Sequence, residues 1–418
     1  MGKDYSHRRE QWYAPLFDEG VFTWDRMDGE EYALANLHSI TKEFRDELAL
    51  ATQRLYQVYG KVGDVLHRGK AELFFELGLP KETLLLMKKT IPHMLLTGIG
   101  RFDFAETDQG LKMLEFNSDT PTGIVEAYYV NERICRILGV DNPNEAMDSH
   151  IPAGFHKMIS VYEENGYKTE NLYFSSLEWH VEDAGTTRYL MSQSGCKGRF
   201  IPLKNLRVND EGLFADVNGN LLPVDVIYRL HALEILAKEK DPEGFPSGAL
   251  LLDLAAHGKV ALINPPSAFL VQSKGVQALI WSLHQSGEFF TREEHQWIEQ
   301  YLLPTYFENV FLGKESYVKK PVFGREGGGV AFFNRDGVKQ EGETGGGYGN
   351  QPVVYQKAVE LPGIQVETLK GLFEGRLLWG SFVMGGIPSA IVARVGGRIT
   401  NNGSYYLPVG LKGDGKHC

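Results

Sequence analysis

Apolar residues follow two different spacings along the chain. In the first hundred residues they recur every three to four positions, which predicts amphipathic helices. One helix is predicted over 34–58, a second over about 64–77 and a third over 82–91. We expect these helices to serve as scaffold.

Between residues 98 and 254 helical and strand-like patterns are mixed. An apolar run over 123–138 predicts a helix, whereas 172–177, 187–192 and 224–228 alternate or are rich in β-formers and predict strands. This mixture is typical of an α/β region. A Pro- and Gly-rich stretch at 241–248 favours a boundary near its end.

The last third of the chain is expected to be mostly strand. Two helices come first, over 274–284 and from Thr291 to about 303, the second with a capping-box start. Strand patterns separated by glycine-rich joints follow at 316–322, 329–333, 352–359, 377–384 and 389–395. Short joints between strands favour a largely antiparallel sheet.

These patterns predict an α/β (α+β) protein of three regions. They are an N-terminal helical segment (1–97), an α/β region (98–255) and a final region (256–418). A chain of 418 residues is long enough for more than one core.

Composition narrows the classes of partner. Acidic residues outnumber basic ones by 54 to 43, which argues against nucleic acid as the main partner. No apolar run is as long as a membrane span, and the polar start does not read as a signal peptide. The three cysteines lack metal-ligand spacing. We expect a cytoplasmic protein without nucleic-acid or membrane partners.

A hairpin carries the clearest chemical signal. Two strands, 101–104 and 114–117, flank a polar turn, and a centre near Gln109 places Asp103 opposite Glu115 and Arg101 opposite Asn117. Two carboxylates and a carboxamide oxygen suit Mg²⁺, and the guanidinium beside them suits phosphate. The phenylalanines between them would face a core. A surface hairpin with ion-paired charges is the alternative.

A lysine and a glycine-rich loop form a second candidate. Lys320 ends a strand, and the loop 324–329 follows it, an arrangement in which an ammonium and backbone amides can hold phosphate oxygens. The chain has no GxxxxGK[ST] pattern, so this is not a P-loop. A glycine hairpin without a ligand explains the pattern about equally well.

Three weaker signals complete the set. The strand at 353–362 could offer backbone groups to an adenine edge, and Arg394 could contact phosphoryl oxygens. The adjacent acids Glu182 and Asp183 could hold an ammonium group. Each has a plainer explanation: an ordinary strand, an arginine reaching to solvent, and a solvated acidic face.

Several of these segments together resemble the glutathionylspermidine synthase family, of the ATP-grasp type. The resemblance covers roughly 12–412 and depends on RFDF and LEFNSDTPT (101–104, 114–122), SKGVQALIWSL (273–283), VKKPVFGREGG (318–328), VYQKAVELP (354–362) and the segment 385–394. It implies an ATP-grasp region at 256–418 and a pre-ATP-grasp α/β region at 98–255.

The resemblance also implies a role for each matching residue. Asp103, Glu115 and Asn117 match magnesium ligands, and Arg101 and Arg394 match catalytic arginines that face phosphate. The residues that match ATP contacts are Arg101, Asp103, Lys274, Lys320, Glu326, Gly327, Gln356, Lys357, Ala358 and Val359. Thr120 matches the site of the thiol-peptide acid, and Glu182 and Asp183 match that of the polyamine.

The implied activity is an ATP- and Mg²⁺-dependent ligase that joins a carboxylate (peptide or glutathione-like) to an amine (polyamine-like) through an acyl phosphate. Bifunctional relatives carry an amidase domain ahead of the synthetase, and we expect none here, as in single-domain bacterial acid–amine ligases. The acid and the amine stay open. So do two alternatives, a small-molecule kinase and a non-catalytic nucleotide- or polyamine-binding protein.

Overall fold

The computed structural model describes residues 2–325, 327–342, 351–399 and 403–413. Its helices are α1 (Gly2–Asp18), α2 (Lys42–Leu66), α3 (Ala71–Glu76), α4 (Leu84–Met87), α5 (Asn131–Leu138), α6 (His150–Glu164), α7 (Val181–Gln193), α8 (Leu233–Leu236), α9 (Ser247–Ala256), α10 (Pro266–Gln272), α11 (Lys274–Ser286) and α12 (Arg292–Tyr301). None of the helices within these ranges is both long and apolar enough to cross a membrane.

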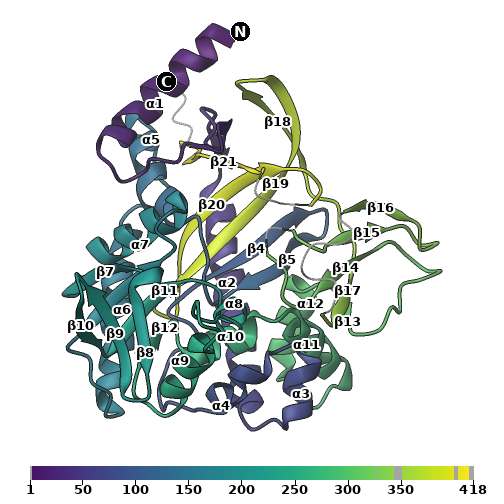
Figure 1. Cartoon of the computed structure of the whole chain (residues 1–418). Helices are drawn as coiled ribbons and strands as arrows, with labels where there is room; N and C mark the ends of the chain where they lie inside the picture. Colours follow the sequence, from purple (N-terminus) through teal and green to yellow (C-terminus); the bar gives the residue numbers. More distant parts are fainter. Residues whose placement is uncertain (1, 326, 343–350, 400–402, 414–418) are drawn as a thin grey trace.

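A six-stranded antiparallel sheet runs through the centre (Figure 1). Its order is β21 (Tyr405–Leu407), β20 (Ile387–Gly396), β19 (Gly371–Met384), β4 (Ile99–Thr107) and β5 (Gly110–Asn117), with β18 (Gly363–Thr368) also paired to β19. The hairpin β4–β5 thus shares a sheet with strands nearly 300 residues later in the chain.

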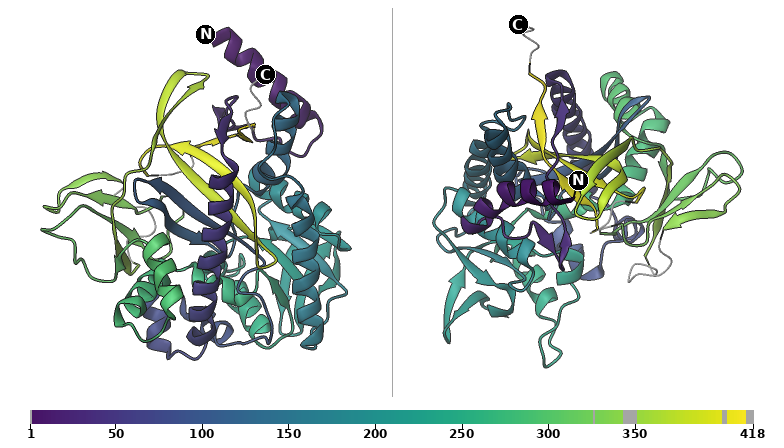
Figure 2. Two further views of the ribbon diagram at one scale, coloured as in Figure 1. Left: turned by 180° about the vertical axis from the view of Figure 1, so that it is seen from behind. Right: turned by 90° about the horizontal axis from the view of Figure 1, so that it is seen from above.

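The long helix α2 covers one face of this sheet, as the view from behind shows (Figure 2). Thr41 caps its first turn by accepting a hydrogen bond from the Phe44 amide at 3.2 Å. Tyr59 of α2 packs edge-on against Phe102 and Phe116, which stack at 3.8 Å between ring centres. The apolar face of the hairpin is therefore covered, and its polar face is left for other contacts.

A second antiparallel sheet lies beside the open face of the hairpin. Its order is β13 (Thr305–Tyr306), β17 (Val353–Lys357), β14 (Tyr317–Pro321), β15 (Ala331–Phe333) and β16 (Lys339–Gly342). The strands expected in the last third and their antiparallel pairing are confirmed, although β19 begins at Gly371 and not at 377. The strands β16 and β18 were not predicted.

A four-stranded parallel sheet occupies the other side of the molecule. Its order is β12 (Ala261–Ile263), β11 (Val226–Leu230), β6 (Leu172–Ser176) and β7 (Gly198–Pro202), and beside it lies the antiparallel sheet β10 (Asn220–Val224), β9 (Gly212–Val217) and β8 (Leu206–Asn209). Two small pairings remain, β1 (Arg26–Met27) with β2 (Glu30–Glu31) and β22 (Val409–Leu411) with β3 (His38–Ile40).

Four sequence predictions are wrong in detail. The predicted strand at 187–192 lies in helix α7, because β6 and β7 are parallel neighbours and need a crossover between them. The predicted helix at 34–58 begins later and extends to Leu66, and its first residues are extended and lead into β3. The helices predicted at 64–77 and 82–91 shrink to α3 and to a short 3₁₀ turn with α4.

Candidate functional site

The hairpin has the predicted register. Asp103 pairs with Glu115 and Arg101 with Asn117, and an irregularity follows between Asp103 and Phe104. Phe102, Phe104 and Phe116 are buried on the other face. Alternation along the strands therefore places the polar side chains of the hairpin together.

Arg101 and Asp103 form a buried, bidentate ion pair. The guanidinium donates from Nε to Oδ1 at 2.6 Å and from Nη2 to Oδ2 at 2.9 Å, and its Nη1 donates to the Thr122 carbonyl at 2.6 Å. Gly380 of β19 makes room for this arginine, since a Cβ there would lie 2.7 Å from the Arg101 Cδ. The guanidinium is thus held in one orientation.

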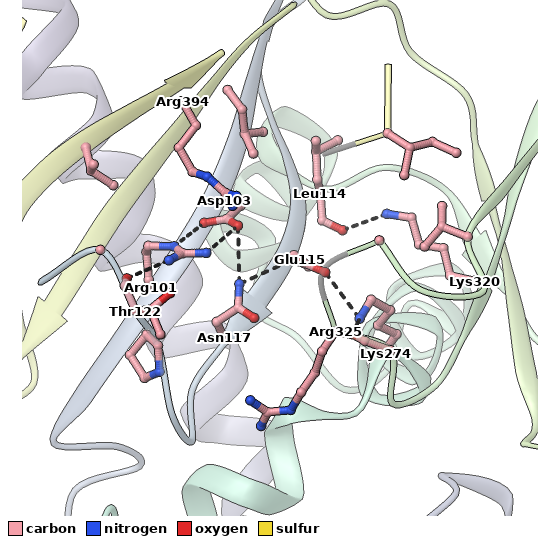
Figure 3. Close-up of a pocket in the computed structure, with 18 of the residues that line it drawn as sticks. Arg101, Asp103, Leu114, Glu115, Asn117, Thr122, Lys274, Lys320, Arg325 and Arg394 are labelled. Carbon is pink, nitrogen blue, oxygen red and sulfur yellow. Dashed lines mark hydrogen bonds and ion pairs between the residues drawn. The ribbon is translucent and has the colours of Figure 1, made fainter. Parts of the chain in front are cut away.

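The Glu115 carboxylate is held by a cation and an amide. Lys274, at the start of α11, places Nζ 3.2 Å from one carboxylate oxygen, and Asn117 donates to the other at 3.2 Å (Figure 3). The same Asn117 amide donates to Asp103 at 3.2 Å. Asn117 therefore lies between the two carboxylates.

Lys320 approaches from the second sheet. Its Nζ donates to the Gln356 side-chain oxygen at 2.6 Å and to the Leu114 carbonyl at 3.1 Å. Lys274 also donates to the carbonyl of Gly324, at the start of the glycine-rich loop, at 3.1 Å. The two lysines thus connect the hairpin to β14 and to the loop 324–329, the segments for which the sequence analysis predicted phosphate binding.

Burial and neighbouring charges shift the protonation of these groups. Burial lowers the pKa of Lys320 to about 8, against the attraction of the Glu115 carboxylate. Burial alone would raise the pKa of Glu115, but the ammonium groups of Lys274 and Lys320 lower it to about 2. Burial raises the pKa of Asp103, against the effect of Arg101. Glu115 is therefore an ion throughout the neutral range.

The donor set suits a hard cation bound together with phosphate. Within the described ranges no three His, Cys, Asp or Glu side chains cluster as a metal site, and the hairpin offers two carboxylates and one carboxamide. Mg²⁺ commonly binds through one or two carboxylates and completes its shell with substrate phosphates and water. Asn117 would present its oxygen once its amide turned over, so these residues fit the ion.

One cavity of about 1580 Å³, counting its open mouth, brings most of the predicted site together. Of the predicted residues it is lined by Arg101, Asp103, Glu115, Asn117, Thr120, Glu182, Asp183, Lys274, Lys320, Gly327, Gln356, Lys357, Val359 and Arg394. Ala358 instead lines a neighbouring groove, with the hairpin turn and the end of α12. Glu326 lies outside the described residues.

The cavity has an apolar part between the two antiparallel sheets. It is lined there by Leu114, Val318, Val330, Phe332, Val359, Leu361 and Leu378. Gln356 of β17 is buried in this wall and holds Lys320 on one side and Thr305 on the other. A flat heterocycle next to two buried lysines would suit such a slot.

The opposite end of the cavity is acidic. Glu182 and Asp183 lie in the first turn of α7, whose N-cap His180 accepts the Asp183 amide hydrogen at 3.3 Å. Burial, together with the charges of Glu126 and Asp183, raises the pKa of Glu182 to about 7. This end could take a cationic group.

Sequence reasoning missed residues that adjoin the cavity. Asp119 pairs with the buried Arg229 of β11 at 2.6 and 3.0 Å, directly before Thr120. Arg325 in the glycine loop donates to the Thr120 hydroxyl at 2.8 Å and to Glu234 at 2.9 Å. The sequence offered a signal for Arg325, which lies inside the glycine motif, but none for the pairing of Asp119.

Residues 3–412 match the family described as glutathionylspermidine synthase preATP-grasp. The chain belongs to this family. The resemblance inferred from the motifs is therefore confirmed.

The similar proteins differ in how much they share with the chain. A Haemophilus influenzae protein named "Putative acid--amine ligase" is 26% identical over 324 residues, 74% of this chain and 73% of its own length. The bifunctional glutathionylspermidine synthetase/amidase of Escherichia coli is 24% identical over 353 residues. That match covers 78% of this chain but 52% of the bifunctional enzyme, so the chain matches about half of that relative.

A solved structure agrees on the fold. The glutathione synthetase-like effector of Globodera pallida, solved without ligand, superposes with a TM-score of 0.59 over 97% of this chain and 96% of its own, at 14% identity. The chain thus has a mixed α/β, glutathione synthetase-like fold of the ATP-grasp type, as predicted.

Proposed function

We propose that the chain is an ATP- and Mg²⁺-dependent ligase that joins a carboxylate to an amine through an acyl phosphate. One observation carries the proposal. A single cavity combines a paired arginine and carboxylate, two buried lysines and an apolar slot at one end with an acidic group at the other. The family membership and the names of the relatives, an acid–amine ligase and a glutathionylspermidine synthetase, point to the same reaction class.

The nucleotide would occupy the end formed by 256–418 and the hairpin. The base would enter the slot beside Gln356, Lys357 and Val359, with Lys274 and Lys320 on phosphate oxygens. Asp103, Glu115 and Asn117 would hold Mg²⁺, which neutralises phosphate charge when bound. The glycine-rich loop, with Gly327, would shield the phosphates from water.

The acid would lie near Thr120, between the phosphates and the acidic end. Its carboxylate attacks the γ-phosphorus, and the bond from that phosphorus to the ADP oxygen breaks, which yields an acyl phosphate and ADP. Arg101 and Arg394 would stabilise the charge that spreads over the transferring group. Transfer of the phosphoryl group converts a poor leaving group into a good one.

The amine would bind at Glu182 and Asp183. Its nitrogen attacks the acyl carbon, the carbon–oxygen bond to phosphate breaks, and the products are an amide and inorganic phosphate. A polyamine suits an acidic cavity wall, because a second ammonium could stay bound to one carboxylate while the first reacts. A peptide or glutathione-like acid is the partner we propose.

A substrate screen that measures ADP, free phosphate and the mass of the product tests this proposal. The protein is incubated with ATP, Mg²⁺ and pairs drawn from γ-glutamyl peptides, including glutathione, and polyamines, including spermidine. A ligase releases ADP and free phosphate when both members of a pair are present, and mass spectrometry finds their sum less water. A stable phosphorylated product would indicate a kinase instead, and nucleotide binding without turnover would indicate a binding protein.

A matched pair of variants assigns the turnover to the cavity. Asp103→Asn removes a charge from the proposed cation site, and we expect turnover to fall by about 10² or more. Asp108→Asn makes the same change in the exposed turn of the same hairpin and should leave turnover unchanged. Equal activity of the two variants would contradict the proposed site.

A further inference from the structure

Glu126 is a buried carboxylate that the proposed reaction does not yet use. It lies in the π-helical turn Glu126–Val130 before α5, with no exposed surface. One oxygen, Oε1, accepts hydrogen bonds from the Trp24 indole at 2.8 Å and from the Tyr32 hydroxyl at 3.0 Å. The other oxygen, Oε2, is buried without a hydrogen-bond partner.

The surroundings of Glu126 connect it to the amine end of the cavity. Tyr32, which holds its Oε1, lines the cavity, as do the two charged groups that act on this carboxylate, Glu182 and Arg394. Tyr406 donates to the Glu126 backbone carbonyl at 3.2 Å. Trp24, the other donor to Oε1, packs its ring against Gly185, in the same helix as Glu182. Glu126 therefore lies behind the cavity wall against which we place the amine.

Two neighbouring carboxylates in such a place do not both stay charged easily. An ionised carboxylate with an unsatisfied buried oxygen is costly, and a like charge beside it adds to the cost. The two Oε1 donors are neutral groups and offset only part of it. Arg394 also acts on Asp103 at the phosphate end, so its charge is shared between the two ends. A proton shared by the pair relieves this cost, as in other close carboxylate pairs.

We propose that Glu126 is a positioning residue that shares one proton with Glu182 and so keeps Glu182 basic enough to deprotonate the substrate ammonium. This inference rests on the proposed ligase function and deepens it, because it limits the amine class to those that arrive protonated, such as primary alkylamines and polyamines.

The proton has a defined path. A substrate R–NH₃⁺ gives one proton to the carboxylate left on the pair, and the resulting R–NH₂ attacks the acyl carbon. As the carbon–nitrogen bond forms and the carbon–oxygen bond to phosphate breaks, the second proton leaves nitrogen with the departing phosphate, as HPO₄²⁻. The pair then returns its extra proton to water, and atoms and charge balance.

The protonation of each member agrees with this arrangement. Burial raises the pKa of Glu126, and burial with the charges of Glu126 and Asp183 raises the pKa of Glu182 to about 7. The groups that face the pair are Tyr32, Tyr406, His180, Asp183 and Arg394. His180 and Arg394 favour the ionised form of Glu182, and Asp183 opposes it. Glu182 therefore titrates near neutral pH.

The first test needs no substrate. Infrared difference spectra at neutral pH compare the wild type with Glu126→Gln, a substitution whose amide oxygen can still accept from Trp24 and Tyr32. We expect the wild type to show the carbonyl band of a protonated carboxylic acid, and the variant to lack it. The absence of that band from the wild type, or its persistence in the variant, would overturn the shared proton.

The second test uses two nucleophiles. Hydroxylamine is largely neutral near neutral pH, so trapping of the acyl phosphate as a hydroxamate needs no base, whereas spermidine arrives protonated. We expect Glu126→Gln to keep hydroxamate formation and to lose about tenfold in the rate with spermidine or another active polyamine. Its rate should also rise at a pH about one unit lower than that of the wild type, because the charge that raises the Glu182 pKa is gone.

A control and the remaining outcomes separate the two proposals. Glu132→Gln, in the first turn of α5, changes an exposed carboxylate paired with Arg136 and should behave as wild type in both assays. An unchanged pH profile in Glu126→Gln, or an equal loss with both nucleophiles in a variant with wild-type melting temperature, would overturn the inference and leave the ligase intact. A wild type that forms neither hydroxamate nor amide would overturn the ligase, and the inference with it.

Discussion

The two ends of the cavity handle charge in opposite ways. At the phosphate end each carboxylate has a cation of its own, Asp103 with Arg101 and Glu115 with Lys274, and Lys320 adds a further positive charge. At the other end Glu182 and Asp183 are adjacent in α7, and Glu126 lies behind them. The charge of Arg394 favours the ionised forms of Glu126 and Glu182, and His180 favours the ionised form of Glu182. The cations of the phosphate end would favour binding of an anion there, and the acids of the other end would favour binding of a cation.

This difference between the two ends would let one cavity bind two substrates of opposite charge. Burial lowers the pKa of Lys320 and so favours its neutral form, and burial raises the pKa values of Glu126 and Glu182 and so favours theirs. In the proposed reaction, phosphate would favour the charged form of Lys320, and an ammonium would favour the charged forms of the two acids. Each substrate therefore relieves a cost that the empty protein bears. The charge of Arg394 acts on acids of both ends, so the proposed reaction would form the amide near this residue.

The largest expected effect comes from breaking the phosphate end. Arg101→Lys keeps the charge but loses the fork that grips Asp103 and the Thr122 carbonyl. Arginines that stabilise a transferring phosphoryl group contribute about 10³ or more in rate, and we expect a loss of that order in ADP release. A steady-state assay of ADP release measures this loss of rate. Arg207→Lys, in an exposed pair with Asp216, is the control. A loss below tenfold would mean that the fork does not act on the reaction.

A different buried pair should affect folding instead. Asp119→Ala would leave Arg229 charged and unpaired with 2% of its side chain exposed, and breaking such a pair costs about 3–5 kcal/mol. Urea unfolding should show this loss, whereas Glu178→Ala, which breaks an exposed pair with Lys204, should cost under about 1 kcal/mol. A loss under about 1 kcal/mol in Asp119→Ala would show that its pair with Arg229 does not stabilise the fold.

How much of this could be read from the sequence depends on the distance over which residues interact. The hairpin was predictable because alternation and a turn fix the partners of Asp103 and Arg101 within twenty residues. The site of Glu126 was not, because the residues around it come from two other segments, Trp24 and Tyr32 from either side of the hairpin β1–β2 and Glu182 from α7. A local sequence pattern cannot predict contacts between residues that are this far apart in the chain.

The errors in secondary structure have the same origin. The Thr-Thr-Arg-Tyr-Leu run after Glu182 has strand propensity, but the parallel neighbours β6 and β7 require the helix α7 between them. The parallel sheet itself was only partly predicted, since the short β12 has no alternation of its own. Tertiary context decided these segments. The family motifs supplied Lys274 and Thr120, for which the local pattern gave no chemical signal.

A smaller effect is expected from weakening the acidic end. Asp183→Asn removes one charge near the proposed ammonium site but leaves the backbone amide that caps α7. We expect the KM for a polyamine to rise about tenfold, with hydroxamate formation unchanged, because the lost attraction is partly screened by solvent. Glu178→Gln, in an exposed pair with Lys204, is the control. An equal fall in both reactions would mean that the two ends are not separate.

The smallest effect is a pH dependence of nucleotide binding at the phosphate end. Lys320 has a pKa of about 8 in the free protein. Above that pH its side chain loses the positive charge that would attract a phosphate oxygen. Binding of ATP or a non-hydrolysable analogue must then take up a proton, and affinity should fall by at most about tenfold per pH unit above 8. Lys320→Arg keeps its positive charge over this range, so the affinity of this variant for ATP should not change with pH, whatever its absolute value. Calorimetry in two buffers of different ionisation heat measures the proton uptake directly. An affinity in the wild type that does not change between pH 7 and 9 would mean that the phosphates do not contact Lys320. The proposed position of the anion at this end of the cavity would then be wrong.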